Sequence, residues 1–245
     1  MEYALIITIF FKSIFVILVN IKSVEEMQDL KSKLFIGISM LITMILLSGC
    51  GESVEESIYN NLEETIDIES SEASEKISQL EKQDKELLDT VISFNDEELD
   101  KINDKADEAI KVNEDLKEAL NEEEANFKEA KEKFEKSEKQ INKLEEETEK
   151  ELGLEMHEVM MNRYDTYDKL SDIYDKAIEE KINFYNLMKE EDVKEETILE
   201  QVEVVNKNNE EIMNLNNKMN EYTETYNGLK KEFYKEIDLN VEFKD

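Results

Sequence analysis

Side chains able to do chemistry are few in this chain, although carboxylates are abundant. His157 is the only histidine and Cys50 the only cysteine, so neither a His/Cys ligand set for zinc nor an intrachain disulfide can form. None of the five glycines belongs to a phosphate-binding loop motif. His157 is most simply a surface residue beside an apolar seam. We therefore predict no catalytic residue and no cofactor.

The carboxylates themselves favour a solvated surface over a reactive site. A pair of acidic residues could act as acid and base in a wall hydrolase, but such enzymes need a concave pocket that raises one carboxyl pKa. Runs such as residues 122–124 could in principle hold divalent cations. However, neighbouring carboxylates on a helix point in different directions, and calcium sites use an oxygen-rich loop. We predict no metal site.

The charge of the chain excludes another class of partner. The formal net charge is −33, with 63 acidic and 30 basic residues, and the charges before Cys50 cancel. The whole negative charge therefore belongs to the part after Cys50. A surface of this sign repels phosphate polymers, so we expect no nucleic-acid partner.

Cys50 lies at the end of a signal-like segment. Lys31 and Lys33 precede a mostly apolar run over residues 34–47, and Ser48 and Gly49 lead to the cysteine. Such a run suits a secretory signal and is short for a membrane span. The quartet at residues 47–50 resembles the bacterial lipobox, in which the cysteine sulfur receives diacylglycerol. We predict lipidation of Cys50 and anchoring of the chain, as a palmitate-bearing lipoprotein, on the extracellular face of the cell membrane.

The residues before Met27 form a second apolar run that lacks a basic leader. A start at Met27 would give a signal peptide over residues 27–49, a normal length for this class. We interpret residues 1–26 as a mispredicted extension, and the alternative is a genuine additional membrane segment. The remaining chain is expected to form a lipidated tether over residues 50–56 and an acidic helical domain over residues 57–241.

The domain sequence predicts long helices with one buried seam each. No proline and few glycines interrupt it. From Leu99 onward, mostly apolar residues recur at alternating steps of three and four, which is the spacing of a helix buried along one stripe. The positions are 99, 102, 106, 109, 113, 116, 120, 123, 127, 130, 134, 137, 141 and 144. Similar stripes precede and follow this segment.

These stripes predict an all-α, elongated, antiparallel up-and-down bundle of four helices, each about 40–50 residues long. We expect breaks at residues 93–96, where Asn95 or Asp96 can cap a helix, near Gly153, and at residues 189–192. Asp192 and Glu195 have capping-box spacing. If the turn near Gly153 is absent, residues 97–189 would form one helix in a three-helix or extended coiled coil.

A group of aromatic residues and the only arginine suggest a binding region. If the last two helices form a hairpin, their seams meet in a tyrosine-rich stretch with one guanidinium. Tyrosine and arginine are frequent anchors of binding patches, although tyrosines at this spacing also fill bundle cores. The candidate binding residues are Arg163, Tyr164, Tyr167, Tyr222 and Tyr226.

The same residues carry a family resemblance, which extends from the lipobox to about residue 241. The order of the following residues resembles the YkyA-like family of cell-wall-binding lipoproteins of Gram-positive bacteria: Arg163, Tyr164, Tyr167, Asp168, Lys169, Leu170, Asn220, Glu221, Tyr222, Thr223, Tyr226, Asn227, Phe233 and Tyr234. The resemblance implies an exported lipoprotein with a helical bundle and supplies no catalytic residue.

The sequence thus favours a non-enzymatic, membrane-anchored lipoprotein that binds peptidoglycan or an envelope protein. Two alternatives remain: a structural spacer or coiled-coil partner, and a wall hydrolase that uses acidic residues. Anionic wall polymers would be repelled by this surface unless divalent cations bridge the two.

Overall fold

The computed structural model describes residues 53–70, 72–94 and 99–239. The predicted signal peptide, Met27, Cys50 and the predicted caps Asn95 and Asp96 lie outside these ranges. Every regular element within them is an α-helix: α3 (Val54–Glu69), α4 (Ala73–Val91), α5 (Leu99–Ile141), α6 (Glu147–Met188) and α7 (Glu195–Glu236). The predicted all-α class is therefore confirmed. No helix in the described ranges is both long enough and apolar enough to cross a membrane.

The helices contribute to two compact units, which are described separately. Among the described residues, unit 1 holds 72–94, 99–122 and 170–214, and unit 2 holds 53–70, 123–169 and 215–239. Each unit contains four helical segments. Unit 1 uses α4 and parts of α5, α6 and α7, whereas unit 2 uses α3 and the other parts of the same three helices.

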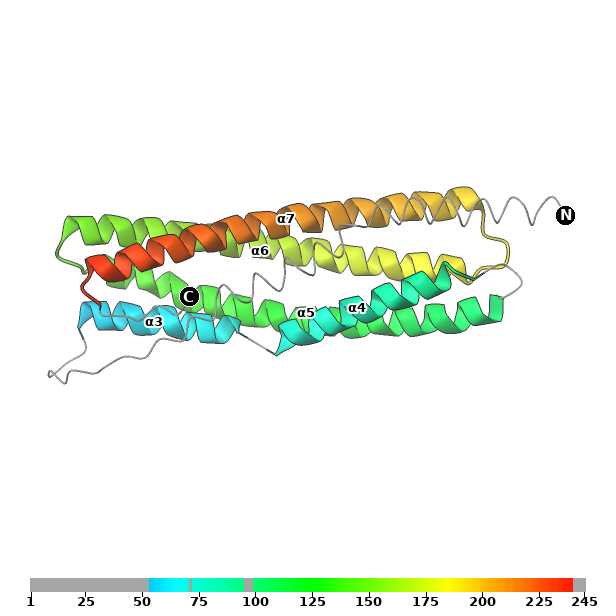
Figure 1. Ribbon diagram of the computed structural model, residues 1–245, viewed down its shortest axis with the longest axis horizontal. Helices are drawn as coiled ribbons and strands as arrows, with labels where there is room; N and C mark the ends of the chain where they lie inside the picture. Colours follow the sequence, from blue (N-terminus) through cyan, green and yellow to red (C-terminus); the bar gives the residue numbers. More distant parts are fainter. Residues whose placement is uncertain (1–52, 71, 95–98, 240–245) are drawn as a thin grey trace. The chain divides into compact units, whose positions relative to one another are not determined.

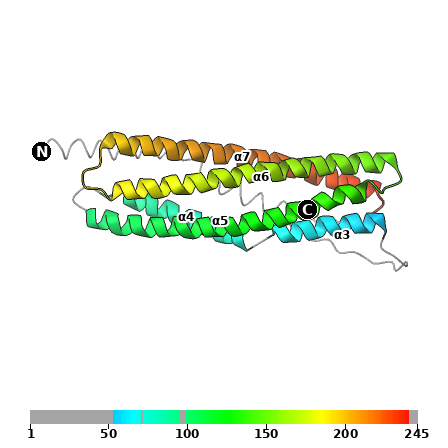
Figure 2. The same ribbon diagram turned by 180° about the vertical axis from the view of Figure 1, so that it is seen from behind.

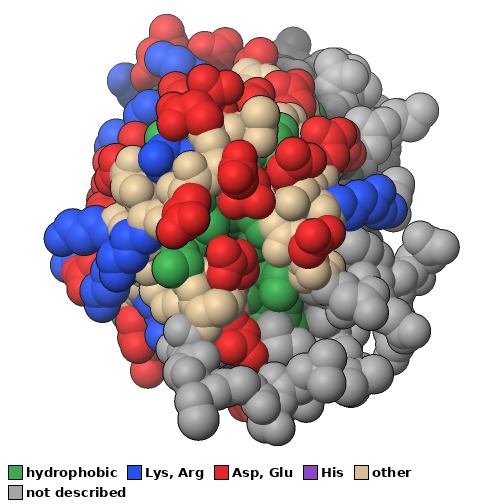
Figure 3. All heavy atoms as spheres, turned by 90° about the vertical axis from the view of Figure 1, so that its left-hand side faces the viewer, with side chains coloured by type: hydrophobic (Ala, Val, Ile, Leu, Met, Phe, Trp, Pro, Cys, Tyr) green, Lys and Arg blue, Asp and Glu red, His purple; other side chains and the backbone are tan. Residues whose placement is uncertain are grey.

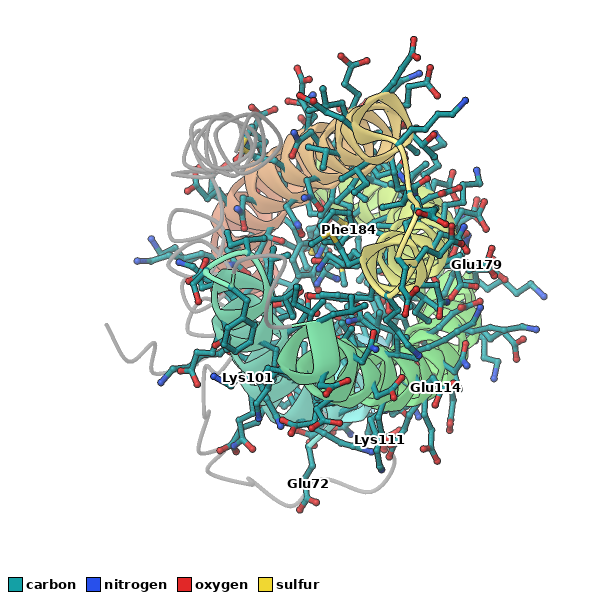
Figure 4. The ribbon with its side chains drawn as sticks, turned by 90° about the vertical axis from the view of Figure 1, so that its right-hand side faces the viewer. Glu72, Lys101, Lys111, Glu114, Glu179 and Phe184 are labelled. Atoms are coloured by element: carbon teal, nitrogen blue, oxygen red, sulfur yellow. The ribbon has the colours of Figure 1, made fainter. Side chains whose placement is uncertain are left out.

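Unit 1 is an up-and-down four-helix bundle. Lys117 on α5 pairs with Glu179 on α6, and Lys189 at the end of α6 pairs with Asp107 earlier on α5, so these two helices run antiparallel. Figure 4 shows Phe184 among the helices, while Glu179 lies on the outside. The core joins side chains of all four helices, namely Leu87, Val91, Ile92, Ile102, Ala106, Ala109, Val112, Phe184, Tyr185, Met188, Ile198 and Val202.

Unit 2 has the same arrangement, with α3 in place of α4. The side chain of Gln140 near the end of α5 donates to Ser57 Oγ near the start of α3 (2.8 Å), so these helices are antiparallel. Figure 1 shows α3 beside the later part of α5, and Figure 2 shows the same pair from behind. The most deeply buried apolar and aromatic side chains come from all four segments and include Ile58, Leu62, Phe134, Ile141, Met156, Tyr164, Phe233 and Tyr234.

The predicted seam of α5 is the buried side of this helix. Every position of the predicted series is buried except Leu99 and Glu123, which are half-buried. The seam includes the polar residues Asn113 and Ser137, both fully buried. The spacing of three and four residues therefore located the interior face of α5 correctly, whatever the residue type at each position.

The first predicted helix is two helices. α3 begins at Val54, where the side chain of Ser53 accepts from the backbone N–H of Glu56 (3.1 Å), and it ends at Glu69. The hydroxyl of Ser70 donates to the carbonyl of Ile66 (2.9 Å), and α4 begins three residues later at Ala73. Serine side chains compete for backbone groups in this way, which favours helix ends. The prediction of one helix of 40–50 residues was wrong here.

The turn between α5 and α6 exists, but the prediction placed it near Gly153 and the structure places it at residues 142–146. The alternative of a single helix over residues 97–189 is therefore wrong as well. Gly153 lies inside α6, where it permits close packing. A Cβ atom at this position would lie 2.8 Å from Ile141 Cγ2 and 2.9 Å from Phe233 Cε2.

The turn between α6 and α7 lies where the sequence indicated, after Met188, but the predicted capping box does not start α7. The backbone carbonyl of Lys194 accepts from the N–H of Ile198 (3.3 Å), which makes Lys194 the N-cap, two residues after Asp192. Glu195 is the first residue of α7 rather than the third.

We predict that substitution of alanine for the two helical glycines changes the free energy of unfolding in opposite directions. Gly153→Ala inserts a methyl group between the fully buried Ile141 and Phe233, and overpacking of this kind costs about 1–3 kcal/mol. Gly228 is exposed and a Cβ there meets nothing within 4 Å. Gly228→Ala should therefore raise the free energy of unfolding by about 0.5–1 kcal/mol through helix propensity alone. Urea unfolding of both variants measures the difference, and stabilisation by Gly153→Ala would contradict the packing.

Candidate functional site

The five candidate binding residues all lie in unit 2, and four of them are buried. Arg163, Tyr164, Tyr167 and Tyr226 are at most 5% exposed, whereas Tyr222 is half-buried. The structure therefore places most of this group in the bundle interior, which was the alternative interpretation of their spacing. Their role in binding stays a prediction.

Arg163, Tyr164 and Tyr226 lie close together, and the other two make separate contacts. The ring of Tyr167 stacks on Phe127 with centroids 3.7 Å apart and planes 8° apart. Lys218 lies over the ring of Tyr222, 5.6 Å from its centroid. Phe127 also has the guanidinium of Arg163 5.3 Å from its ring centroid. Stacked and cation–π contacts of this kind explain why aromatic residues follow the seam.

Arg163 is the centre of a buried polar set that joins α3, α6 and α7. Its Nη1 donates to Glu69 Oε2 (2.8 Å), and its Nε donates to Thr223 Oγ1 (3.0 Å). The hydroxyl of Tyr164 donates to the other carboxylate oxygen of Glu69 (2.5 Å). The side chains of Arg163 and Glu69 are 1% and 2% exposed. The only arginine of the chain thus neutralises a carboxylate that solvent does not reach.

Burial and the neighbouring carboxylate keep Tyr164 protonated. Burial is the main cause that raises the pKa of Tyr164 well above its ordinary value, and the charge of Glu69 raises it further. The pKa of Tyr226 is raised for the same main reason, with contributions from Glu63 and Glu69. Both phenols therefore remain neutral, and Tyr164 acts as a hydrogen-bond donor.

A second set, with a lysine as the cation, joins α3 and α7 in unit 2. Lys230 Nζ donates to Glu63 Oε1 (2.7 Å), and the hydroxyl of Tyr234 donates to the same oxygen (3.0 Å). Lys230 is 4% exposed. Burial lowers the pKa of Lys230, while the charge of Glu63 and its hydrogen bond oppose this shift. The carboxylate is thus the group that makes a charged lysine tolerable at this depth.

A third set lies in unit 1 around Asp84, a polar residue on the buried side of α4. Its Oδ1 accepts from Asn113 Nδ2 (2.5 Å) and from the hydroxyl of Tyr185 (2.9 Å). Its Oδ2 accepts from Lys181 Nζ (2.8 Å). Asp84 is 2% exposed. We refer to the sets around Glu63, Glu69 and Asp84 as the three buried acid sets, although Glu63 itself is half-buried against the buried Lys230.

The three buried acid sets share one pattern that sequence reasoning missed. In each set the acid lies on α3 or α4, and its cation and tyrosine lie together on one later helix. The pairs are Lys230 with Tyr234, Arg163 with Tyr164, and Lys181 with Tyr185. In the sequence, these sets could have been found only from a basic residue that lies one or four positions before a tyrosine of a predicted seam. Helices without such buried sets also contain this pair of residues, so the signal is not specific.

His157 was predicted to be a surface residue, but it is half-buried in unit 2 and packs against the seam of α5. Its ring stacks on Phe134 with centroids 5.1 Å apart, and its Nε2 is buried without a hydrogen-bond partner. Burial lowers its pKa, and the carboxylates of Glu138 and Glu135 oppose that shift. Among the described residues, His157 belongs to no group of potential metal ligands.

Carboxylates also gather at the end of unit 2 where α3 begins and α7 ends. Glu149 has a raised pKa, caused first by burial and then by the charges of Glu146, Glu55, Glu236 and Asp238. Figure 3 shows acidic side chains spread across this face, with hydrophobic side chains between them. No group of three or more potential ligands is placed to hold a metal ion in the described part of the chain.

Comparison with known proteins gives one family and one relative. The sequence model of the YkyA family, described as "Putative cell-wall binding lipoprotein", matches residues 53–236. The chain is 26% identical over 193 residues to the uncharacterized lipoprotein YkyA of Bacillus subtilis (strain 168), a match that covers 78% of this chain and 86% of the relative. No solved structure matches the chain.

Removal of the buried arginine should destabilise unit 2 strongly. Arg163→Met leaves the Glu69 carboxylate buried beside Tyr164 alone, and an unpaired buried charge costs about 3–5 kcal/mol. The double change Glu69→Met/Arg163→Met should cost less than the sum of the single changes, because no charge is left unpaired. Urea unfolding measures all three variants. Glu179→Gln, which removes an exposed partner of Lys117, is the control and should change stability by about 0–1 kcal/mol. If the double change costs as much stability as the two single changes together, the pairing of Glu69 with Arg163 is contradicted.

Protonation of His157 should lower the free energy of unfolding below neutral pH. Because its folded pKa is lowered from 6.5, the fold binds fewer protons than the unfolded chain, and stability present above pH 6.5 is lost as the pH falls towards the folded pKa. The ring-proton resonance of this single histidine should titrate with a midpoint below 6.5. In His157→Phe, which retains a ring against Phe134, the loss of stability between about pH 7.5 and about pH 5.5 should be smaller. A midpoint at or above 6.5 would show that burial does not dominate.

Proposed function

Because the chain belongs to the YkyA family of lipoproteins, we propose that it is a non-enzymatic lipoprotein, anchored by Cys50 on the outer face of the cell membrane, that binds the cell wall. An envelope protein is the alternative partner of the same surface. The proposal combines the family match with the signal-like segment that precedes Cys50.

The observation that carries the proposal is the position of the helical domain relative to Cys50. The family match begins at residue 53, and α3 begins at Val54 with Ser53 as its N-cap. Three residues of fully extended chain reach about 11 Å at most. A lipid on Cys50 would therefore hold the start of α3 close to the membrane surface, which is the geometry of a membrane-proximal binding domain.

The described side chains support binding more than catalysis. The buried carboxylates of Glu69 and Asp84 and the half-buried carboxylate of Glu63 each have a cation and a tyrosine hydroxyl as partners, so they are committed to holding helices together. A hydrolase would instead need a carboxyl pair exposed to substrate in a pocket. A structural coiled-coil partner would need an exposed apolar seam, and Val204 is the one large hydrophobic residue of the described ranges that is exposed.

The charge of the chain restricts the chemistry of the wall contact. With a net charge of −33, the domain is repelled by anionic wall polymers at low ionic strength. Contact with the wall therefore involves peptidoglycan itself, or divalent cations that bridge carboxylates of the two surfaces. The half-buried Tyr222 and the acidic face in Figure 3 are the parts of unit 2 that we propose for this contact.

Two experiments on the full chain test the anchor and the ligand separately. Cells grown with labelled palmitate should incorporate the label into the wild-type protein and not into Cys50→Ala, which should leave the membrane fraction. Purified peptidoglycan, with and without attached anionic polymers, should retain the protein. Loss of retention only in a chelator would assign the contact to bridging cations. If the wild-type protein incorporates no palmitate label, the anchor is contradicted. If purified peptidoglycan does not retain the protein under any condition, wall binding is contradicted.

A further inference from the structure

A small cavity in unit 2 borders the buried Arg163. It is lined by residues of α3, α6 and α7, namely Ile66, Glu69, Met160, Arg163, Thr223, Tyr226 and Asn227. The space inside it is about 10 Å³, which is about what one water molecule requires.

One nitrogen of the guanidinium is left for this space. Nε is bonded to Thr223 and Nη1 to Glu69, whereas Nη2 is buried and has no hydrogen-bond partner. Arg163 as a whole is 1% exposed, so bulk solvent does not satisfy this nitrogen. An unpaired buried donor is unfavourable, and more so when the group is charged. The structure thus combines an unsatisfied donor with a cavity of matching size.

The charges around the cavity decide the class of ligand. Arg163 is already paired with Glu69, and nearby Lys230 is paired with Glu63, so the surroundings are close to neutral. A second anion would compete with Glu69 and meet repulsion from both carboxylates. A cation would meet the guanidinium. The ligand must therefore be uncharged, accept a hydrogen bond and be the size of one oxygen atom.

We propose that one buried water molecule occupies this cavity and accepts a hydrogen bond from Arg163 Nη2. Tyr226 and Asn227 also contribute polar side chains to the lining, and buried waters typically make about three hydrogen bonds. The water gives the guanidinium a third oxygen partner beside Glu69 and Thr223. A lysine at position 163 has a single nitrogen and cannot reach Thr223, Glu69 and the water with the fixed fork of an arginine. This site is independent of any wall ligand.

A crystal structure of the full chain at a resolution that shows ordered water tests the proposal directly. We expect one spherical density peak in the cavity, about 2.7–3.2 Å from Arg163 Nη2. Density of several atoms, a bonded protein group on Nη2, or a cavity without density would each overturn the proposal. The wild-type result therefore decides the question even if no variant folds.

Two variants test the assignment to this one nitrogen. Arg163→Lys removes Nη2 and should abolish the peak, which can be scored only if the variant crystallises with unit 2 folded. Lys181→Arg in unit 1 changes a cation of another buried acid set and should leave the peak unchanged. Persistence of the peak in Arg163→Lys, or its loss in Lys181→Arg, would overturn the assignment to Arg163.

Discussion

Burial of carboxylates from α3 and α4 is the interaction on which the rest of the structure depends. The chain has 63 acidic and only 30 basic residues, yet a cation and a tyrosine hydroxyl accompany the buried Glu69 and Asp84 and the half-buried Glu63. Desolvation of such a pair costs about as much as the attraction returns, but loss of one partner costs several kcal/mol. The three buried acid sets therefore determine the register of the helices more than they add net stability.

This arrangement matters for anchoring because α3 is short. A helix of 16 residues is marginal in water, and it gains most of its stability from packing and polar contacts with other helices. In unit 2 these contacts include Ile58 and Leu62 in the core and the ion pairs of Glu63 and Glu69. If Cys50 carries the lipid, α3 is the first ordered element after it. Its contacts with α6 and α7 then join the membrane anchor to unit 2.

The sequence predicted the fold class and the seam of α5, because the spacing of apolar residues along a helix indicates which side is buried. This prediction does not require knowing which residues pack against that side. It did not predict the break after Ser70 or the turn at residues 142–146. At the first break the hydroxyl of Ser70, and at the second the side-chain amide of Asn142, donates to a backbone carbonyl of the preceding turn, a local hydrogen bond that many solvated helices also make. Gly153 was misinterpreted because a glycine that ends a helix and a glycine that permits close packing look alike in sequence.

The candidate site was only partly predictable for a related reason. Arg163 and the tyrosines were recognised by type, but Glu69, the partner of Arg163 and Tyr164, looks like a surface residue among many other glutamates. Native-state hydrogen exchange on the full chain tests most directly whether α3 is held by these contacts. The account predicts that amides of residues 54–69 exchange as slowly as those of α6 in unit 2, with protection lost in Arg163→Met, which leaves the Glu69 carboxylate unpaired. Exchange of α3 at the rate of an isolated helix in the wild-type chain would contradict it.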